Sequence, residues 1–239
     1  MSDSHIPLPE RLRPRDLTQI IGQEHLLGEQ APLRQMIDQG HLPSIIFWGP
    51  PGVGKTTIAL LLAQAVDRPF ISLSALNTGV KELREIIAEG GDLLTPVVFI
   101  DEIHRFNKSQ QDALLNAVEK GKITLIGATT ENPSFEVNSA LLSRCQVYSL
   151  NALSAESIQT LLMQALQNDS FLQERHILIE EFDALIQFAA GDARKALNLL
   201  DLIASTFEPD MENIITNAVV VKVAQQNIAR YDKSGEQHY

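Results

Sequence analysis

Five short apolar segments recur along the first 150 residues, and segments with helical periodicity separate them. They read SIIFWG, PFISLS, PVVFID, ITLIGAT and CQVYSL, at residues 44–49, 69–74, 96–101, 123–129 and 145–150. Continuous apolar strands that alternate with helices are typical of a parallel sheet covered on both faces. The pattern therefore predicts an α/β domain over residues 1–150, with a five-stranded parallel sheet sandwiched by helices.

The pattern changes after residue 150, where apolar positions recur only at helical spacing. SAESIQTLLMQALQ, EEFDALIQFAAG and DARKALNLLDLIAS all show this period. Ser154 is placed to cap the first of these helices, and Glu156 lies in its first turn. We expect a small helical domain over residues 151–230 with no further strands. Residues 231–239 are polar and lack a core pattern, which is typical of a tail.

Composition limits the classes of protein to consider. The chain has 239 residues, 44% of them hydrophobic, so a substantial core can form. No apolar run is long enough to cross a bilayer, and the N-terminus lacks the apolar stretch of a secretory signal, so we expect a cytoplasmic protein. The single Cys145 excludes an internal disulfide, and the His residues show no zinc-ligand spacing. A net charge of -11 argues against a dedicated nucleic-acid-binding domain, so any DNA contact must be local or shared among subunits.

A glycine-rich loop follows the first apolar segment. It fully matches the motif G-x-x-x-x-G-K-[ST], with a strand pattern before it and a helical pattern after it. Glycines let backbone N–H groups turn towards an anion, and the helix N-terminus adds partial positive charge. The motif predicts a nucleoside triphosphate site formed by Gly49, Pro50, Pro51, Gly52, Val53, Gly54, Lys55, Thr56 and Thr57. Lys55 would hold the β- and γ-phosphates and Thr56 would bind Mg²⁺, whereas an ordinary glycine-rich turn is the alternative.

Polar residues end the third and fourth apolar segments. Because ligands bind at the carboxyl ends of parallel strands, we expect Asp101 to hold the Mg²⁺ shell and Glu102 to polarise a water for attack on the γ-phosphate. Two solvated acids closing a strand are the alternative. The next segment ends in Thr129, Thr130 and Asn132, and we expect a hydroxyl or amide there to sense the γ-phosphate. The alternative is that these residues only form the turn after the strand.

Two arginines are candidates for contacts with a γ-phosphate. Arg144 ends a helical pattern just before the fifth apolar segment, and we expect it to reach the γ-phosphate of a neighbouring subunit. Arg194 lies near the start of a helix in the second domain, and we expect it to fold over the γ-phosphate of its own subunit. The alternatives are an arginine that caps a helix end and an exposed helix face, respectively.

The N-terminal segment supplies a candidate adenine pocket. Arg13 and Pro14 are followed by the apolar pair Ile20 and Ile21, directly before Gly22. We expect this segment to line an adenine pocket between the two domains. A purely structural N-terminal helix is the alternative.

These motifs resemble the AAA+ ATPases of the clamp-loader branch, over essentially the whole chain. Within that branch, WGPPGVGKTT, DEIHRFNKSQQDALL, IGATTENPSFEVNSALLSRC and GDARKALNLL look like the replication-associated recombination protein A family, also called MgsA and related to the eukaryotic Werner-interacting ATPases. HRFNKSQQD and GATTENPSFE are specific to this resemblance, whereas the Walker segments are generic. The resemblance implies a P-loop NTPase fold of the AAA+ type, followed by a helical lid.

The resemblance also implies an activity and partners. It implies Mg²⁺-dependent and DNA-dependent hydrolysis of ATP to ADP at stalled forks, gaps or duplex ends, in replication, recombination and repair. Single-stranded DNA-binding protein is the implied partner, and the nucleoid the implied location. The resemblance assigns Lys55 and Thr56 to the Walker A motif and Asp101 and Glu102 to the Walker B motif. It also assigns Thr130 as sensor 1, Arg144 as the arginine finger and Arg194 as sensor 2. Comparison with clamp loaders further implies that Ser74 restrains Glu102 until DNA binds.

One departure from the family bears on oligomerisation. Family members continue into a helical C-terminal domain that makes the tetramer, whereas this sequence stops at Tyr239. If Arg144 acts in trans, the isolated chain is expected to be only weakly active.

The DNA contact and the exact role leave alternatives open. Four basic residues would line the interior of an oligomeric ring and contact DNA phosphates without reading the bases: Lys81, Arg84, Arg105 and Lys108. The alternative is that they are ordinary solvated charges. A clamp-loader subunit and an ATP-switched recruitment factor with little turnover are the alternatives to a DNA-directed ATPase. A branch-migration motor similar to RuvB is disfavoured, because its winged DNA-binding module has no counterpart here.

Overall fold

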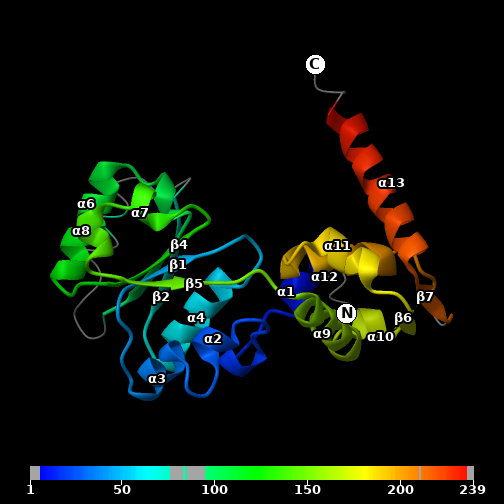
Figure 1. Ribbon diagram of the computed structural model, residues 1–239, viewed down its shortest axis with the longest axis horizontal. Coiled ribbons are helices and arrows are strands. Elements are labelled where there is room, and N and C mark those ends of the chain that lie inside the picture. The colour runs from blue at the N-terminus through cyan, green and yellow to red at the C-terminus, as the bar shows by residue number, and fades with distance from the viewer. Residues whose placement is uncertain (1–5, 76–82, 84, 86–94, 210, 236–239) are drawn as a thin grey trace. The chain divides into compact units, whose positions relative to one another are not determined.

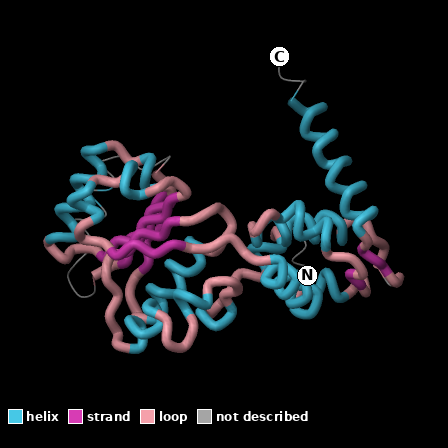
Figure 2. The backbone as a smooth tube through the Cα atoms, in the orientation of Figure 1, coloured by secondary structure: helices cyan, strands magenta, loops and turns pink. Residues whose placement is uncertain are grey.

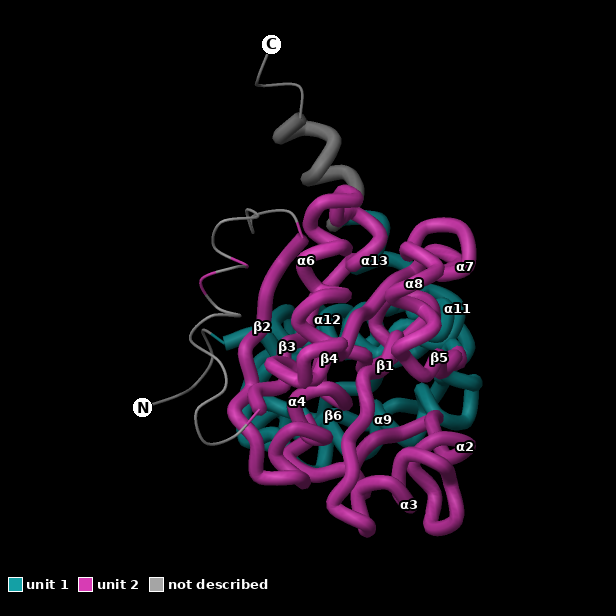
Figure 3. The backbone as a smooth tube through the Cα atoms, turned by 90° about the vertical axis from the view of Figure 1, so that its left-hand side faces the viewer, with its two compact units in different colours: residues 1–13, 152–239 teal, residues 14–151 magenta. Residues whose placement is uncertain are grey.

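The computed structural model describes residues 6–75, 83, 85, 95–209 and 211–235. Its contacts divide the chain into a sheet unit, residues 14–151, and a helical unit, residues 1–13 with 152–239 (Figure 3). The division at residues 1–150 and 151–230 stays a prediction, and the structure adds that residues 6–13 pack with the helical unit.

The sheet unit contains five parallel strands, which confirms the predicted fold class (Figures 1 and 2). The strands are β1 (Ile45–Trp48), β2 (Phe70–Ser74), β3 (Val97–Asp101), β4 (Thr124–Thr129) and β5 (Gln146–Ser149). Each lies within one of the predicted apolar segments. The order in the sheet is β2-β3-β4-β1-β5. Strand β4 therefore lies between the strand that precedes the glycine-rich loop and the strand that ends in the two acids.

Burial follows the position of each strand in the sheet. The central strands β1, β3 and β4 are almost entirely buried, whereas the edge strand β2 is partly exposed and the edge strand β5 largely exposed. Ile46, Val98, Ile100 and Leu125 belong to one buried cluster, which also includes residues of α6. Central strands with both faces covered must be apolar at every position, which explains the continuous apolar runs.

Helices cover both faces of this sheet. They are η1 (Leu17–Gln19), α2 (Glu24–Leu27), α3 (Pro32–Asp38), α4 (Lys55–Ala65), η2 (Ile103–Arg105), α6 (Lys108–Glu119), α7 (Pro133–Glu136) and α8 (Ser139–Leu142). Figure 1 shows α4 on one side of the sheet and α6 on the other. Asn107 starts α6 with a reciprocal capping box, in which its side chain and that of Gln110 each accept a backbone N–H.

The helical unit consists of helices around a central α12, together with two short strands. Its elements are α1 (Leu8–Arg11), α9 (Ala155–Asn168), α10 (Ser170–Gln173), β6 (Ile177–Ile179), α11 (Asp183–Ala189), α12 (Ala193–Ala204), β7 (Asn213–Ile215) and α13 (Asn217–Gly235). Helix α12 contacts α1, α9, α11 and α13. The expectation of no further strands was wrong, because β6 and β7 pair in parallel over three residues each. Strands of three residues are too short to show the alternation of apolar and polar positions that predicts a strand.

A buried ion-pair cluster attaches the N-terminal segment to the helical unit. The Arg11 guanidinium contacts the carboxylates of Asp169 (2.7 Å) and Asp201 (3.1 Å), and the Arg11 and Asp169 side chains are only 8% and 5% exposed. The hydrogen bond with Asp169 is the main cause that raises the pKa of Arg11. Among the described residues, no helix combines the length and apolarity needed to span a membrane.

Candidate active site

The glycine-rich loop connects β1 to the N-terminus of α4, as the motif predicts. Gly52 and Gly54 adopt φ angles of 71° and 99°. Residues with a Cβ are strained in this region, so the loop needs glycine at both positions. Val53 is buried, whereas Pro50 and Pro51 are exposed. The loop is thus a left-handed backbone turn at the start of an 11-residue helix, which is the geometry of an anion cradle.

Gly49 is required for space rather than for its φ angle. A Cβ built on Gly49 would lie 2.4 Å from the carbonyl oxygen of Leu150. The N–H of Gly49 donates to the carbonyl oxygen of Thr129 (3.1 Å). The start of the loop is therefore pressed between the end of β4 and the segment that follows β5.

Lys55 lies inside this loop. Its ammonium donates to the carbonyl oxygens of Gly49 (2.7 Å) and Pro50 (2.8 Å), and the residue is 8% exposed. A buried ammonium needs such partners because burying an unpaired charge is costly. Thr56 and Thr57 follow in the first turn of α4 and are half-buried. One cation, backbone amides and hydroxyl groups thus converge at one helix N-terminus.

The two acids end β3, on the same edge of the sheet as the loop. Asp101 Oδ1 accepts the N–H of Glu102 (3.1 Å). Glu102 adopts a left-handed conformation, with φ 54° and ψ 47°, and its carboxylate lies 3.3 Å from His104 Nε2. A non-glycine residue in this conformation is uncommon and is stabilised here by the turn it starts. The left-handed turn redirects the chain straight after the strand.

The end of β4 separates the acids from the loop. Thr129 is fully buried, and its hydroxyl contacts His104 Nδ1 (2.9 Å) and the backbone N–H of Glu131 (3.0 Å). Thr130, the predicted sensor, is half-buried, and Asn132 caps α7 through Ser134 N. Sequence analysis did not assign a role to His104. The signal for a role in the site that the sequence does offer is the position of His104, two residues after Glu102.

Part of the predicted adenine segment lies beside the loop's helix. Helix η1, which ends just before Ile20, contacts α4, and both Ile20 and Ile21 are half-buried. The Gln23 side chain, 1% exposed, donates to the carbonyl of Asn151 (2.8 Å) and accepts its N–H (3.1 Å). These two bonds attach the segment to the chain just after β5.

The remaining predicted residues are distributed over both units. Arg13 and Arg194 belong to the helical unit and Pro14 to the sheet unit. Arg194 is exposed in the first turn of α12. Arg13 pairs with Glu10, and this hydrogen bond is the main cause that lowers the pKa of Glu10, with a smaller contribution from Arg194. The two arginines therefore act on one carboxylate within the helical unit.

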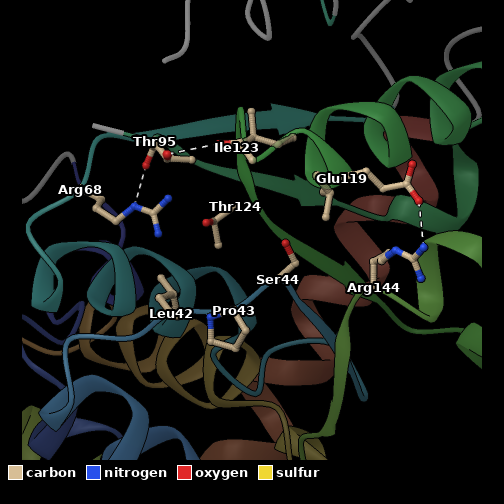
Figure 4. A pocket seen from close by; sticks show the side chains of 11 residues that line it. Leu42, Pro43, Ser44, Arg68, Thr95, Glu119, Ile123, Thr124 and Arg144 are labelled. Atoms are coloured by element: carbon tan, nitrogen blue, oxygen red, sulfur yellow. Dashed lines mark hydrogen bonds and ion pairs between the residues drawn. The ribbon is translucent and has the colours of Figure 1, made fainter. Parts of the chain in front are cut away.

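Arg144 lies at the opposite edge of the sheet. It follows α8, precedes β5 and pairs with Glu119 at the end of α6 (3.1 Å), with side chains 52% and 42% exposed. Both line a hollow of about 630 Å³ at the amino ends of the strands, between Arg68 on one side and Arg144 on the other (Figure 4). Because the glycine-rich loop lies at the carboxyl ends, this hollow is distinct from the predicted triphosphate site.

Burial shifts the acid–base properties of two groups at this amino edge. It lowers the pKa of Arg68, whose Nε donates to the carbonyl of Thr95 (2.6 Å). It raises the pKa of the Cys145 thiol to about 12. Burial thus disfavours the thiolate, which is the reactive form of cysteine.

The predicted DNA-contacting residues are described only in part. Arg105 in η2 and Lys108 at the start of α6 are both exposed. Lys81 and Arg84 lie outside the described residues. Ser74 ends β2 beside Asp101 in the sheet register.

Two family profiles match the chain. The profile of the ATPase family associated with various cellular activities (AAA) matches residues 45–153, and that of the AAA C-terminal domain matches residues 172–239. The first covers the sheet unit from β1 onwards, and the second lies within the helical unit.

Whole-chain relatives agree with these profiles. The chain is 45% identical to the replication-associated recombination protein A of Coxiella burnetii over all of its length and 56% of that protein, and 40% identical to the ATPase WRNIP1 of Dictyostelium discoideum over 99% of its length and 30% of that protein. It spans about half the length of the bacterial relatives it matches. The RuvB Holliday junction branch migration motor of Thermotoga maritima superposes with a TM-score of 0.75, at 26% identity over 90% of this chain and 72% of that one. The chain therefore belongs to the AAA family of ATPases, and over its whole length it is similar to part of the replication-associated recombination protein A.

Proposed function

We propose that this chain is the ATP-binding and ATP-hydrolysing part of a DNA-dependent ATPase in replication-fork maintenance, recombination and repair. The observation that carries the proposal is the meeting of three elements at one sheet edge. They are the glycine-rich loop with Lys55, the acids Asp101 and Glu102, and the end of β4 between them. The similarity to replication-associated recombination protein A supports the biological setting.

The loop fits a triphosphate. Gly52 and Gly54 hold a left-handed turn at the N-terminus of α4, the end of a helix at which backbone N–H groups favour an anion. Lys55, with Gly49, Pro50, Pro51, Val53 and Thr57 around it, would bind the β- and γ-phosphates. Thr56 and Asp101 supply the oxygen donors that Mg²⁺ prefers, and the ion would neutralise charge on the phosphates.

Glu102 is the proposed water-activating base, and Thr130 the proposed contact to the attacked phosphate. A general base of this kind contributes roughly 10² to 10⁴ in rate. In the same proposal Arg144 serves a neighbouring subunit's γ-phosphate, and its exposure supports this assignment. Arg194 senses the nucleotide from the helical unit, while Arg13, Pro14, Ile20 and Ile21 bind the adenine.

The whole protein is proposed to act on DNA as an oligomer. The net charge of -11 favours local phosphate contacts, for which exposed Arg105 and Lys108 are the described candidates. A homotetramer, binding to single-stranded DNA-binding protein and association with the nucleoid complete the proposal.

ATP hydrolysis and ATP binding test the proposal when measured separately. The assay compares wild type with Glu102→Gln, with and without Mg²⁺, against single-stranded, gapped, forked and blunt-ended DNA. We expect Glu102→Gln to bind ATP normally and to lose roughly 10² to 10⁴ of the turnover. Failure of the wild-type chain to bind ATP or ADP at millimolar concentration would reject the proposed function.

The same variant separates the alternative roles. A recruitment factor switched by ATP binding would keep its cellular function in Glu102→Gln, because it needs binding rather than turnover. A clamp-loader subunit would co-purify with a sliding clamp, and the clamp would stimulate hydrolysis.

A further inference from the structure

His104 links the end of β3 to the end of β4 by two side-chain contacts. Its Nε2 lies 3.3 Å from a carboxylate oxygen of Glu102, and its Nδ1 lies 2.9 Å from the hydroxyl of Thr129. The His104 side chain is only 13% exposed, and Thr129 is fully buried. The imidazole thus bridges the proposed base and the strand that separates this base from the glycine-rich loop.

The backbone explains why the imidazole reaches both partners. Ile100 pairs with Gly127 in the β3–β4 register, so Glu102 and Thr129 are at corresponding positions just beyond it. The left-handed turn at Glu102 starts η2, which contacts β4. A Cβ on Gly127 would lie 2.9 Å from Ile103 Cδ1, so the absent side chain of Gly127 leaves room for fully buried Ile103. Ile103 therefore anchors the turn that carries His104.

The proposed bridge requires one arrangement of protons when the imidazole is neutral. The Glu102 carboxylate can only accept, so in this arrangement the proton lies on Nε2, which is 3.3 Å from a carboxylate oxygen. Nδ1 then accepts from the Thr129 hydroxyl, which in this arrangement donates to Nδ1 rather than to the Glu131 carbonyl oxygen 3.2 Å away. That hydroxyl still accepts the N–H of Glu131 (3.0 Å). Both ring nitrogens of His104 thus lie beside a polar group, which restricts the orientation of the imidazole.

The bridge continues through the backbone to the glycine-rich loop. The carbonyl oxygen of Thr129 accepts the N–H of Gly49, the first residue of the loop (3.1 Å). Thr129 therefore contacts the loop through its backbone and His104 through its side chain. A shift of the β4 end would move both contacts together.

We propose that His104 is a positioning residue, which orients the Glu102 carboxylate relative to the β4 end and the glycine-rich loop. This inference rests on the proposed function, because it assumes that Glu102 activates water. His104 itself contacts neither phosphate nor metal in this assignment. Its loss affects the hydrolytic step and spares nucleotide binding, because Lys55 and the loop amides remain in place.

Substitutions at position 104 test this role in the chain. We expect His104→Ala to lower kcat roughly tenfold to a hundredfold, as misplacing a reacting group does, while the Kd for ATP stays within about twofold. His104→Gln places an amide near the position of Nε2 and should restore part of kcat. His104→Asn places it near Nδ1, towards Thr129, and should not. His41→Ala, at an exposed histidine of the same unit, is the matched control and should behave as wild type.

Two kinetic outcomes would overturn the inference while leaving the proposed function intact. One is a folded His104→Ala chain with wild-type kcat, and the other is equal rescue by Gln and Asn. A parallel loss of kcat and ATP affinity would assign His104 a merely structural role. A wild-type chain that binds ATP without any hydrolysis would contradict the proposed function instead, since weak activity is expected even when Arg144 has no neighbouring subunit.

A second measurement tests the bridge without relying on turnover. In ¹⁵N-histidine NMR spectra of the chain at mildly alkaline pH, we expect His104 to show the neutral Nε2–H tautomer. Thr129→Ser, which keeps the hydroxyl, should preserve this signal, and Glu102→Gln should shift it. The Nδ1–H tautomer, or a His104 signal insensitive to Glu102→Gln, would contradict the bridge.

Discussion

The two edges of the same parallel sheet are built in opposite ways. At the carboxyl edge, Lys55, Thr129 and His104 are 8%, 0% and 13% exposed, and each has short hydrogen bonds within the unit. At the amino edge a hollow of about 630 Å³ remains, and Arg144 has an exposed ion pair with Glu119. The carboxyl edge is therefore preorganised, whereas the amino edge can exchange its partners.

This difference matches the roles proposed for the two edges. Groups that act on a bound nucleotide gain from being held in place before it arrives, because reorganisation costs rate. An arginine that acts on a neighbouring molecule must instead leave its partner within its own chain. An exposed pair suits this purpose because its net contribution to stability is small.

The largest expected effect comes from Gly49, which lies between the end of β4 and the segment that follows β5. Gly49→Ala would place a Cβ 2.4 Å from the Leu150 carbonyl oxygen, a backbone atom that cannot rotate away. We expect the free energy of unfolding to fall by about 3 kcal/mol or more, the upper part of the range for overpacking. Urea denaturation of the purified chain measures this change.

Gly127→Ala is the control for this prediction. Its Cβ would meet the side-chain methyl groups of Ile46 (2.7 Å) and Ile103 (2.9 Å), which can adjust. We expect a loss of about 1 kcal/mol. A smaller loss for Gly49→Ala than for Gly127→Ala would show that the segment after β5 does not restrain the loop.

An intermediate effect is expected from Lys55. Lys55→Ala removes the ammonium that lies within the loop, against the carbonyls of Gly49 and Pro50. Hydrogen bonds to charged groups contribute about 1.5–3 kcal/mol, so ATP affinity should fall roughly tenfold to a hundredfold. Fluorescence titration with a labelled ATP analogue measures this affinity. The control is Lys122→Ala, at an exposed lysine of the same unit, which should bind ATP as wild type does. Equal ATP affinities for wild type and Lys55→Ala would show that the loop does not bind the nucleotide.

The contrast between the edges also explains what could be predicted from sequence. Each strand of the large sheet lies within a predicted segment, because strands buried on both faces must be apolar throughout. The glycine-rich loop could be predicted because its chemistry is local: consecutive residues supply the turn, the cation and the helix start. The spacing of Asp101 and Glu102 after an apolar run likewise indicated the strand end.

Features that depend on distant contacts could not be predicted. Arg11 meets Asp169 and Asp201 across 158 and 190 residues, so no local pattern shows that the first residues join the helical unit. Thr129 and Thr130 are equivalent in sequence, and only the direction in which the β4 end faces distinguishes the buried hydroxyl from the half-buried one. His104 lies beside Thr129 because β3 and β4 are neighbours, which the order of strands along the chain does not reveal.

The smallest effect is expected at the amino edge, from the Glu119–Arg144 pair. A double-mutant cycle with Glu119→Gln and Arg144→Gln should give a coupling free energy of about 0.2–1 kcal/mol, because both side chains are largely exposed. Added salt should reduce this coupling further, since exposed charges are screened. The Arg34–Asp38 pair (3.2 Å, side chains 38% and 58% exposed) is a matched control within one helix and should behave alike.

A Glu119–Arg144 coupling free energy above about 2 kcal/mol would contradict the contrast drawn between the two edges. Such a value would mean that Arg144 is fixed within its own unit and can be released only at high cost. The proposed action of Arg144 on a neighbouring subunit would then require compensation from the interface. Coupling in the expected range, similar to that of Arg34–Asp38, leaves Arg144 available to exchange Glu119 for an anion of another molecule at little cost in free energy.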